Sequence, residues 1–146
     1  FLFTILGIPS IYYGSEWGIS GCKTGGSDDG LRPAIDLEHF ENKNPWLTKL
    51  ITALARAKAE CTELSFGEYR ELLLKNKQYA YARIFEDKAS VIALNNDSQP
   101  EEFWLSLPLP ANGAVNLLTG EPAEIKDGKL HFTVGGNDGV LIRLNS

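Results

Sequence analysis

Apolar side chains dominate the first 13 residues of the chain, where Gly7 and Pro9 are the main interruptions. Pro9 suits the first position of a strand, because no backbone N–H is needed there for pairing. The tripeptide Ile11-Tyr12-Tyr13 follows without polar alternation, which is typical of a strand covered on both faces. The pattern therefore predicts the end of a helix and then a buried strand over residues 8–13.

No hydrophobic period persists between residues 14 and 43, a stretch rich in glycine and carboxylate side chains. This composition predicts a long loop, and loops of such length are commonly functional or disordered. Asn44-Pro45 is a typical helix start, with Asn as the cap and Pro at the first helical position. Apolar residues then recur at spacings of three and four, at Leu47, Leu50, Ile51, Leu54, Ala57 and Cys61. The spacing predicts an amphipathic helix that packs against a sheet and carries no chemistry.

Beyond Glu63 the pattern changes to short, β-rich runs that are separated by turn residues. The runs lie at residues 66–74, 79–85, 89–94, 101–107, 114–118, 129–134 and 139–144. Asp127-Gly128, between two lysines, is the sequence of a type I′ hairpin. Seven short strands at this spacing predict an antiparallel β-sandwich that begins near Thr62. Its expected core is Tyr79, Tyr81, Phe85, Val91, Phe103, Leu105, Leu118, Phe132 and Ile142.

The composition of the chain excludes several classes of protein and partner. With 146 residues, of which 43% are hydrophobic and 23% charged, the chain has the make-up of an ordinary globular protein and not of a disordered tail. The net charge of −5 argues against nucleic acid or an anionic membrane as a partner. The apolar start is too short to span a bilayer and lacks the flanks of a signal peptide. Because the chain is apolar from residue 1 and contains no methionine, we expect it to be the tail of a larger protein.

The two cysteines are not expected to form a disulfide, because a disulfide scaffold uses more cysteines in a shorter chain. Cys61 lies on the apolar helical stripe and is expected to be a buried thiol, whereas Cys22 lies in a polar, glycine-rich loop. His39 and His131 have no neighbouring ligand spacing, so no metal site and no cofactor are expected.

The end of the first predicted strand carries the most informative chemistry. The strand stops at Gly14 and is followed by Ser15, Glu16 and Trp17. In a (β/α)₈ barrel the C-terminal ends of the strands face the active site. The fold class that this pattern predicts is therefore α/β plus all-β: the last βα unit of a truncated TIM barrel, followed by an antiparallel β-sandwich.

This order of elements resembles the C-terminal end of the α-amylase family, glycoside hydrolase family 13. The segment Gly7-Ile8-Pro9-x-Ile11-Tyr12-Tyr13-Gly14-x-Glu16 is similar to the family's eighth barrel strand. Residues 68–72, 79–83, 91–96 and 117–121 are similar to segments of the family's sandwich, called domain C. The likeness is greatest to cyclomaltodextrinase, neopullulanase and maltogenic amylase. Ser15 departs from the aspartate that is common in the family, and residues 17–36 match no member of known specificity.

The resemblance implies residues 1–61 as the C-terminal remnant of the catalytic barrel and residues 62–146 as domain C. It also implies a retaining hydrolase of α-glucosidic bonds, which uses two carboxyl groups about 5–5.5 Å apart. In the family these groups come from the fourth and fifth strands, with a third acidic residue after the seventh. We therefore expect no catalytic residue in this chain and no activity of the chain alone. Arg32 and Asp36, and the acidic residues of 37–42, are interpreted as solvated loop charges.

Glu16 and Trp17 are the best candidates for substrate binding, because a carboxylate can accept hydrogen bonds from sugar hydroxyls and an indole can stack on a pyranose ring. The alternative is that both residues pack structurally within the loop. Asp28 and Arg32 are candidates for outer subsites, and the alternative for them is a solvated loop with an internal ion pair. Trp104 lies on the opposite strand face from Phe103 and Leu105. It is interpreted as packing against the barrel, with an exposed sugar platform as the alternative.

The expected partners are an α-glucan oligosaccharide and the preceding barrel of the same protein. Without that barrel, the apolar strand over residues 8–13 is expected to self-associate or to be poorly ordered. A homo-oligomer is therefore a further possible partner state. One rival reading is a glucosyltransferase or isomerase on the same scaffold, which products formed with an acceptor sugar would distinguish. Another is a non-catalytic carbohydrate-binding or structural β-sandwich module, which predicts sugar binding by the sandwich through exposed aromatic side chains.

Overall fold

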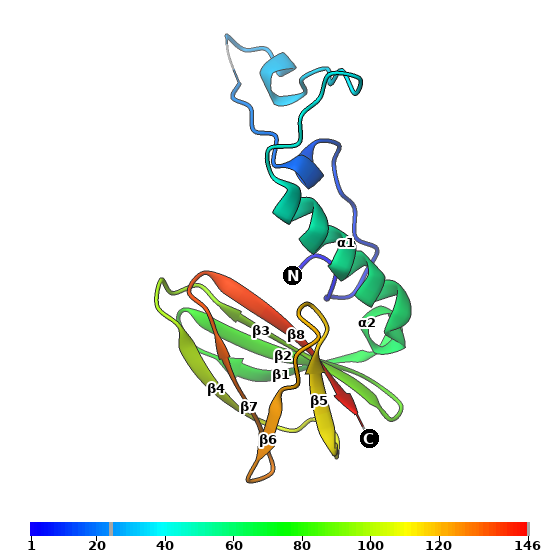
Figure 1. The fold of residues 1–146 in the computed structure, drawn as a ribbon, viewed down its shortest axis with the longest axis vertical. Helices are drawn as coiled ribbons and strands as arrows, with labels where there is room; N and C mark the ends of the chain where they lie inside the picture. The colour runs from blue at the N-terminus through cyan, green and yellow to red at the C-terminus, as the bar shows by residue number, and fades with distance from the viewer. Residues whose placement is uncertain (24, 146) are drawn as a thin grey trace. The chain divides into compact units, whose positions relative to one another are not determined.

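The computed structural model describes residues 1–23 and 25–145 and divides into two compact units (Figure 1). The sandwich unit consists of Phe1–Ile8 and Ala53–Ser146, and the loop unit consists of Pro9–Thr52. The helix α1, Pro45–Glu60, begins in the loop unit and ends in the sandwich unit. None of the described helices is long and apolar enough to cross a membrane.

Among its described residues, the loop unit holds two short 3₁₀ turns ahead of α1, η1 at Ser15–Trp17 and η2 at Asp29–Leu31. The long loop is therefore confirmed, but the strand predicted over residues 8–13 does not form. A buried strand obtains its hydrogen bonds from strands on either side, and no described segment pairs with these residues. Their apolar side chains consequently remain open, with Ile8 95% exposed.

The helix that was predicted from Asn44-Pro45 is confirmed as α1. A second helix, α2 at Thr62–Phe66, was not predicted. Cys61 separates the two helices and is buried, as expected, whereas Cys22 is exposed; both are free thiols. Burial raises the pKa of the Cys61 thiol above its usual range.

The sandwich consists of two antiparallel sheets that lie face to face (Figure 1). One sheet has the order β1-β2-β3-β8-β5 and the other has the order β4-β7-β6. The strands are β1 Glu68–Leu74, β2 Gln78–Phe85, β3 Lys88–Asn95, β4 Glu101–Ser106, β5 Gly113–Asn116, β6 Glu124–Lys126, β7 Lys129–Val134 and β8 Asp138–Asn145. All seven predicted strands are present, and only the three-residue β6 was missed.

The central strands β2, β3 and β8 of the five-stranded sheet are buried on both faces, whereas the edge strand β1 is largely exposed. On the inner face, Val91 and Ile142 pack with Phe103 of the other sheet. The outer face of the five-stranded sheet packs on the helical part of the sandwich unit, in a second cluster: Ala57, Cys61, Leu64, Tyr81, Ile92 and Leu141. Burial on both sides explains why β2 and β3 read as nearly continuous apolar runs without alternation.

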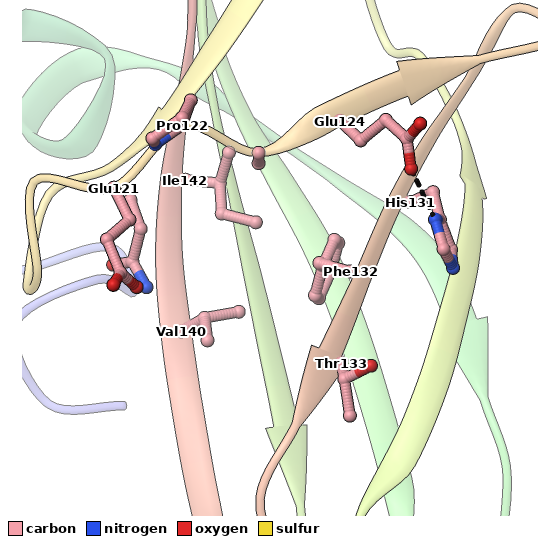
Figure 2. A pocket seen from close by; sticks show the side chains of 10 residues that line it. Glu121, Pro122, Glu124, His131, Phe132, Thr133, Val140 and Ile142 are labelled. Atoms are coloured by element: carbon pink, nitrogen blue, oxygen red, sulfur yellow. Dashed lines mark hydrogen bonds and ion pairs between the residues drawn. The ribbon is translucent and has the colours of Figure 1, made fainter.

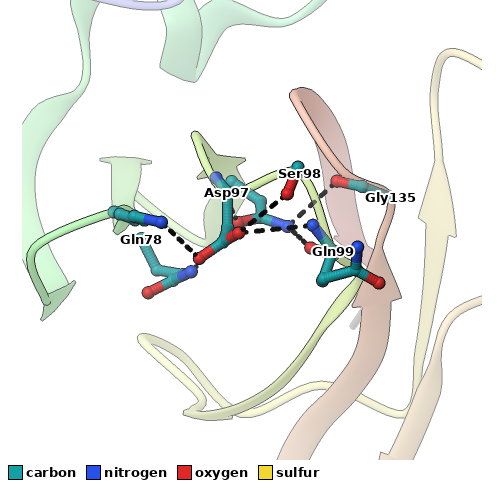
Figure 3. A network of polar contacts seen from close by, with 7 residues as sticks. Gln78, Asp97, Ser98, Gln99 and Gly135 are labelled. Carbon is teal, nitrogen blue, oxygen red and sulfur yellow. Dashed lines mark hydrogen bonds and ion pairs between the residues drawn. The ribbon is translucent and has the colours of Figure 1, made fainter.

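The corner after β3 is fixed by one buried amide. The side-chain nitrogen of Asn95 donates to the carbonyl of Gln99 at 2.8 Å and to that of Gly135 at 3.0 Å. Its oxygen accepts from Gln78 Nε2 at 3.0 Å and from the N–H of Asp97 at 3.0 Å. Figure 3 shows this network, which joins the end of β3 to the turn between β7 and β8. The residues 95–97 are thus a structural turn, as the sequence predicted.

Candidate functional site

The turn that presents Glu16 and Trp17 depends on two glycines. Gly14 and Gly18 flank η1, and both have a left-handed backbone, with φ of 86° and 67°. This conformation is costly for residues with a Cβ, and a Cβ on Gly14 would also lie 3.2 Å from Ile19 Cδ1. The N–H groups of Trp17 and Ile19 both donate to the carbonyl of Gly14, at 3.2 and 3.0 Å. The two glycines therefore set the backbone conformation from which the Glu16 and Trp17 side chains project.

The main chain of Glu16 is anchored by α1, because Thr48 Oγ1 donates to its carbonyl at 2.8 Å. Its side chain is half-buried, and Oε2 is fully buried without a hydrogen bond from any residue that the structure describes. An unpaired buried acceptor of this kind costs about 1–3 kcal/mol. A hydroxyl donor placed against Oε2 would therefore be bound favourably.

Trp17 is half-buried, and its indole packs on Phe40 with ring centroids 4.5 Å apart and planes inclined by 39°. The carbonyl of Trp17 accepts a hydrogen bond from Asn44 Nδ2 at 2.7 Å. Asn44 thus joins the helix start to the η1 turn. One face of the indole is occupied by packing, which leaves the rest of the ring for a ligand.

Asp28 and Arg32 lie on either side of η2 and are exposed. Asp28 forms an ion pair with Lys23 at 3.0 Å. Among the hydrogen bonds and ion pairs of the described residues, none joins Asp28 or Arg32 to Glu16 or Trp17. The loop unit thus contains two separate pairs of candidates, with no hydrogen bond or ion pair between the pairs among the described residues.

Asp36 and His39 form an exposed pair, with Nδ1 2.8 Å from Oδ2. The hydrogen bond from His39 holds the pKa of Asp36 below its usual range. Arg32 forms no hydrogen bond or ion pair with Asp36 within residues 1–23 and 25–145. Across those same residues, no group of three or more His, Cys, Asp or Glu could hold a metal ion.

Two polar clusters of the sandwich unit were not identified from the sequence. One is Glu63, fully buried, whose Oε1 accepts from Ser90 Oγ at 2.7 Å and lies 3.4 Å from Arg143 Nε. The other joins Trp104, His131 and two glutamates on the outer face of the three-stranded sheet. The second cluster depends on the pairing of β4 with β7, which are far apart in sequence, so only the strand order reveals it.

Comparison with known proteins shows a likeness to the C-terminal part of maltogenic amylases and related enzymes. Residues 69–140 match the family described as "Maltogenic Amylase, C-terminal domain". The chain is 29% identical over 145 residues to neopullulanase 2 of Thermoactinomyces vulgaris, covering 97% of this chain and 24% of that protein. It is 31% identical over 106 residues to a cyclomaltodextrinase of Thermoanaerobacter pseudethanolicus, covering 73% and 18%.

The fold is also found in a solved structure of an Anoxybacillus α-amylase. The TM-score is 0.84 at 27% identity, and the match covers 99% of this chain and 30% of that one. The chain therefore spans a quarter or less of the length of these two curated relatives, at 24% and 18%.

Proposed function

We propose that this chain, which belongs to the α-amylase family (glycoside hydrolase family 13), is the C-terminal part of an enzyme that acts on α-glucosidic bonds of maltooligosaccharides or cyclodextrins. The observation that carries this proposal is the extent of the likeness. It covers 97% of the chain in the match to neopullulanase 2 and so reaches well beyond the domain at residues 69–140.

The proposed reaction is retaining hydrolysis, in which one carboxylate attacks the anomeric carbon and a carboxylic acid protonates the leaving oxygen. We place both groups, and a third acidic residue, in the part of the enzyme that precedes residue 1. The 146-residue chain by itself is then inactive. Residues 1–61 would supply the last strand, loop and helix of the barrel, and residues 62–146 would supply domain C. In the complete barrel, neighbouring strands would pair with residues 8–13.

The contribution of this chain to the substrate site is assigned to the loop unit. The Glu16 carboxylate, which is partly exposed although its Oε2 is enclosed, would accept a hydrogen bond from a sugar hydroxyl, and the Trp17 indole would stack on a pyranose ring. Asp28 and Arg32, both exposed, would contact more distant sugar units. No cofactor is needed for this chemistry.

The test is steady-state kinetics of the complete enzyme on β-cyclodextrin and maltoheptaose. Glu16→Gln and Trp17→Ala are expected to raise KM at least about tenfold, because each removes a substrate contact worth on the order of 1.4 kcal/mol. Glu41→Gln, an exposed loop carboxylate, is the control and should leave KM unchanged. An unchanged KM in both site variants would remove Glu16 and Trp17 from the substrate site. Products formed with added glucose as acceptor separate hydrolysis from transfer.

A further inference from the structure

The outer face of the three-stranded sheet carries an ordered row of side chains. The register pairs Trp104 of β4 with His131 of β7, and His131 with Glu124 of β6. Side chains of directly paired residues lie on the same face of a sheet, and Glu102, two residues before Trp104, shares that face. The helices of the sandwich unit pack on the other sheet, so they do not cover this row. Trp104 is 42% exposed.

The row is fixed by hydrogen bonds and stacking. The indole of Trp104 stacks on the imidazole of His131, with centroids 3.8 Å apart and planes inclined by 20°. His131 Nε2 lies 2.7 Å from Glu102 Oε1, and Nδ1 lies 3.0 Å from Glu124 Oε2. With a carboxylate at each nitrogen, the protonated ring can donate from both nitrogens. The hydrogen bonds to Glu124 and Glu102 accordingly raise the pKa of His131 above its usual range.

A cavity opens on the β6 side of His131. It has a volume of about 310 Å³, and Figure 2 shows His131, Glu124 and Thr133 along its wall, with the apolar Phe132, Val140 and Ile142 beside them. The size is at the lower end of the range for small-molecule sites. The imidazole thus covers one face of the Trp104 indole and also belongs to the lining of a cavity that combines polar and apolar side chains.

The charges of this surface favour a neutral ligand. When His131 is protonated, the charges of two carboxylates, its imidazolium and the ammonium of Lys126, 5.9 Å from the Trp104 ring centroid, sum to zero. The Glu102 and Glu124 side chains are 59% and 60% exposed, so their second oxygens can still accept hydrogen bonds. A polyanion would meet two carboxylates here. A sugar ring has an apolar C–H face for the indole and hydroxyls for the charged rim.

From this geometry we propose that the outer face of β4, β7 and β6 is a second sugar-binding surface, on which a glucose unit stacks on Trp104 and its hydroxyls bind Glu102, Glu124 and Lys126. That the sugar is an α-glucan rests on the proposed function; the surface itself rests on the cluster. It is separate in the chain from the candidates in the loop unit, since all of its residues lie in the sandwich unit.

The three tryptophans of the chain make this proposal testable in one titration. In the ¹⁵N–¹H spectrum each indole N–H gives one signal, which single variants assign. Maltoheptaose is expected to shift the Trp104 signal, and cellohexaose, its β-linked counterpart, is not. Trp46, 63% exposed in α1, serves as the internal control. A Trp104 signal that does not move, or that moves equally with cellohexaose, overturns the proposal.

Variants give the second readout, by affinity electrophoresis in soluble starch with the full chain. Trp104→Gln is expected to weaken binding at least about tenfold, as removal of a stacked aromatic anchor does. Trp46→Gln is the matched control and should bind as the parent. Glu124→Gln keeps the indole and should give an intermediate loss, so the test survives if Trp104→Gln misfolds. Retained binding in the Trp104 and Glu124 variants would overturn the proposal and leave this face as a docking surface for another domain.

The two proposals fail separately. A shift of the Trp104 signal, together with an unchanged KM in the Glu16 and Trp17 variants of the complete enzyme, would support the sandwich surface and remove the substrate contacts assigned to the loop unit. A raised KM in those variants without a shift of Trp104 would leave the proposed function in place and overturn the second surface.

Discussion

The hydroxyl oxygens of Thr4 and Tyr81 lie 2.6 Å apart, both buried, although 77 positions separate them in the chain. Thr4 Oγ1 also bonds to the carbonyl of Phe1 at 3.0 Å, and the carbonyl of Thr4 accepts from Arg83 Nη1 at 3.0 Å. Arg83 is fully buried, and burial lowers its pKa. These bonds attach the segment Phe1–Ile8 to β2 and explain why that segment belongs to the sandwich unit.

Removal of the Tyr81 hydroxyl should therefore lower stability. Tyr81→Phe is expected to reduce the free energy of unfolding by about 1 kcal/mol, the usual net value of a buried hydrogen bond. Tyr79→Phe is the control, because its hydroxyl bonds to that of Tyr69 at an exposed position. Urea denaturation followed by circular dichroism measures both. Equal losses in the two variants would mean that the Thr4 contact contributes nothing specific.

The buried carboxylate of Glu63 predicts a larger effect. Glu63→Ala removes the acceptor of Ser90 and the partner of Arg143, so the free energy of unfolding should fall by about 3 kcal/mol. Glu63→Gln, which keeps a side-chain oxygen for Ser90, should lose less. Glu60→Ala, at the exposed end of α1, is the control for removal of a glutamate near the same turn. If Glu60→Ala and Glu63→Ala unfold at the same urea concentration, the buried contact is not stabilising.

In the hairpin between β6 and β7, we expect a substitution to lower the free energy of unfolding through backbone strain alone. Asp127 and Gly128 both have positive φ, 50° and 71°, as a type I′ turn requires. A Cβ on Gly128 would meet no atom within 4 Å, so Gly128→Ala should cost about 1 kcal/mol through backbone strain alone. Gly113→Ala makes the same chemical change in β5 outside the left-handed region and should be neutral or stabilising. Urea denaturation of both would contradict this account if Gly128→Ala were the less destabilising of the two.

His131 predicts how stability depends on pH. Hydrogen bonds to Glu124 and Glu102 raise its pKa above the ordinary 6.5, so its contribution is complete below pH 6.5 and is lost as the pH rises through the folded-state value. The same bonds lower the pKa values of Glu102 and Glu124 below 4.5, so their contribution is present above pH 4.5 and is lost as the pH falls through the folded-state values. The Lys126 side chain faces the same cluster, with Nζ 5.9 Å from the Trp104 ring centroid.

The cluster should thus contribute most between about pH 4.5 and 6.5 and less at pH 8. Thermal unfolding at pH 6 and pH 8 measures this loss. His131→Gln should reduce the difference in Tm between the two conditions. The other histidine, His39, is 80% exposed, and His39→Gln should leave the difference unchanged. A parent chain whose Tm difference matches that of His131→Gln would show that the cluster is not formed in solution.

Local signals predicted those elements whose form depends on their own residues. The Asn44-Pro45 start predicted α1, and the turn residues between apolar runs predicted seven strands. Asp127-Gly128 predicted the hairpin. The strand over residues 8–13 failed because its hydrogen bonds must come from other segments, and none of those described pairs with it. The helix α2 and strand β6 are too short, at five and three residues, for a periodic signal.

The candidate site divides in the same way. Glu16 and Trp17 could be selected from the sequence because a glycine stop after an apolar run is a local feature. The unpaired oxygen of Glu16 and the ion pair of Asp28 with Lys23 depend on loop conformation and could not. The sequence correctly placed Trp104 on the opposite face of β4 from Phe103 and Leu105, and its packing against the barrel stays a prediction. Its stacking on His131 required the pairing of β4 with β7, which are separated by 22 residues between Ser106 and Lys129.

The most direct test of the account is the release of reducing sugar from β-cyclodextrin and maltoheptaose by two proteins. One is the product of the complete reading frame that contains these 146 residues, and the other is the 146-residue chain alone. The account predicts release by the complete protein, with the α-anomer formed first, and none by the chain alone. Release by the chain alone, or no release from any α-glucan by the complete protein, would contradict it.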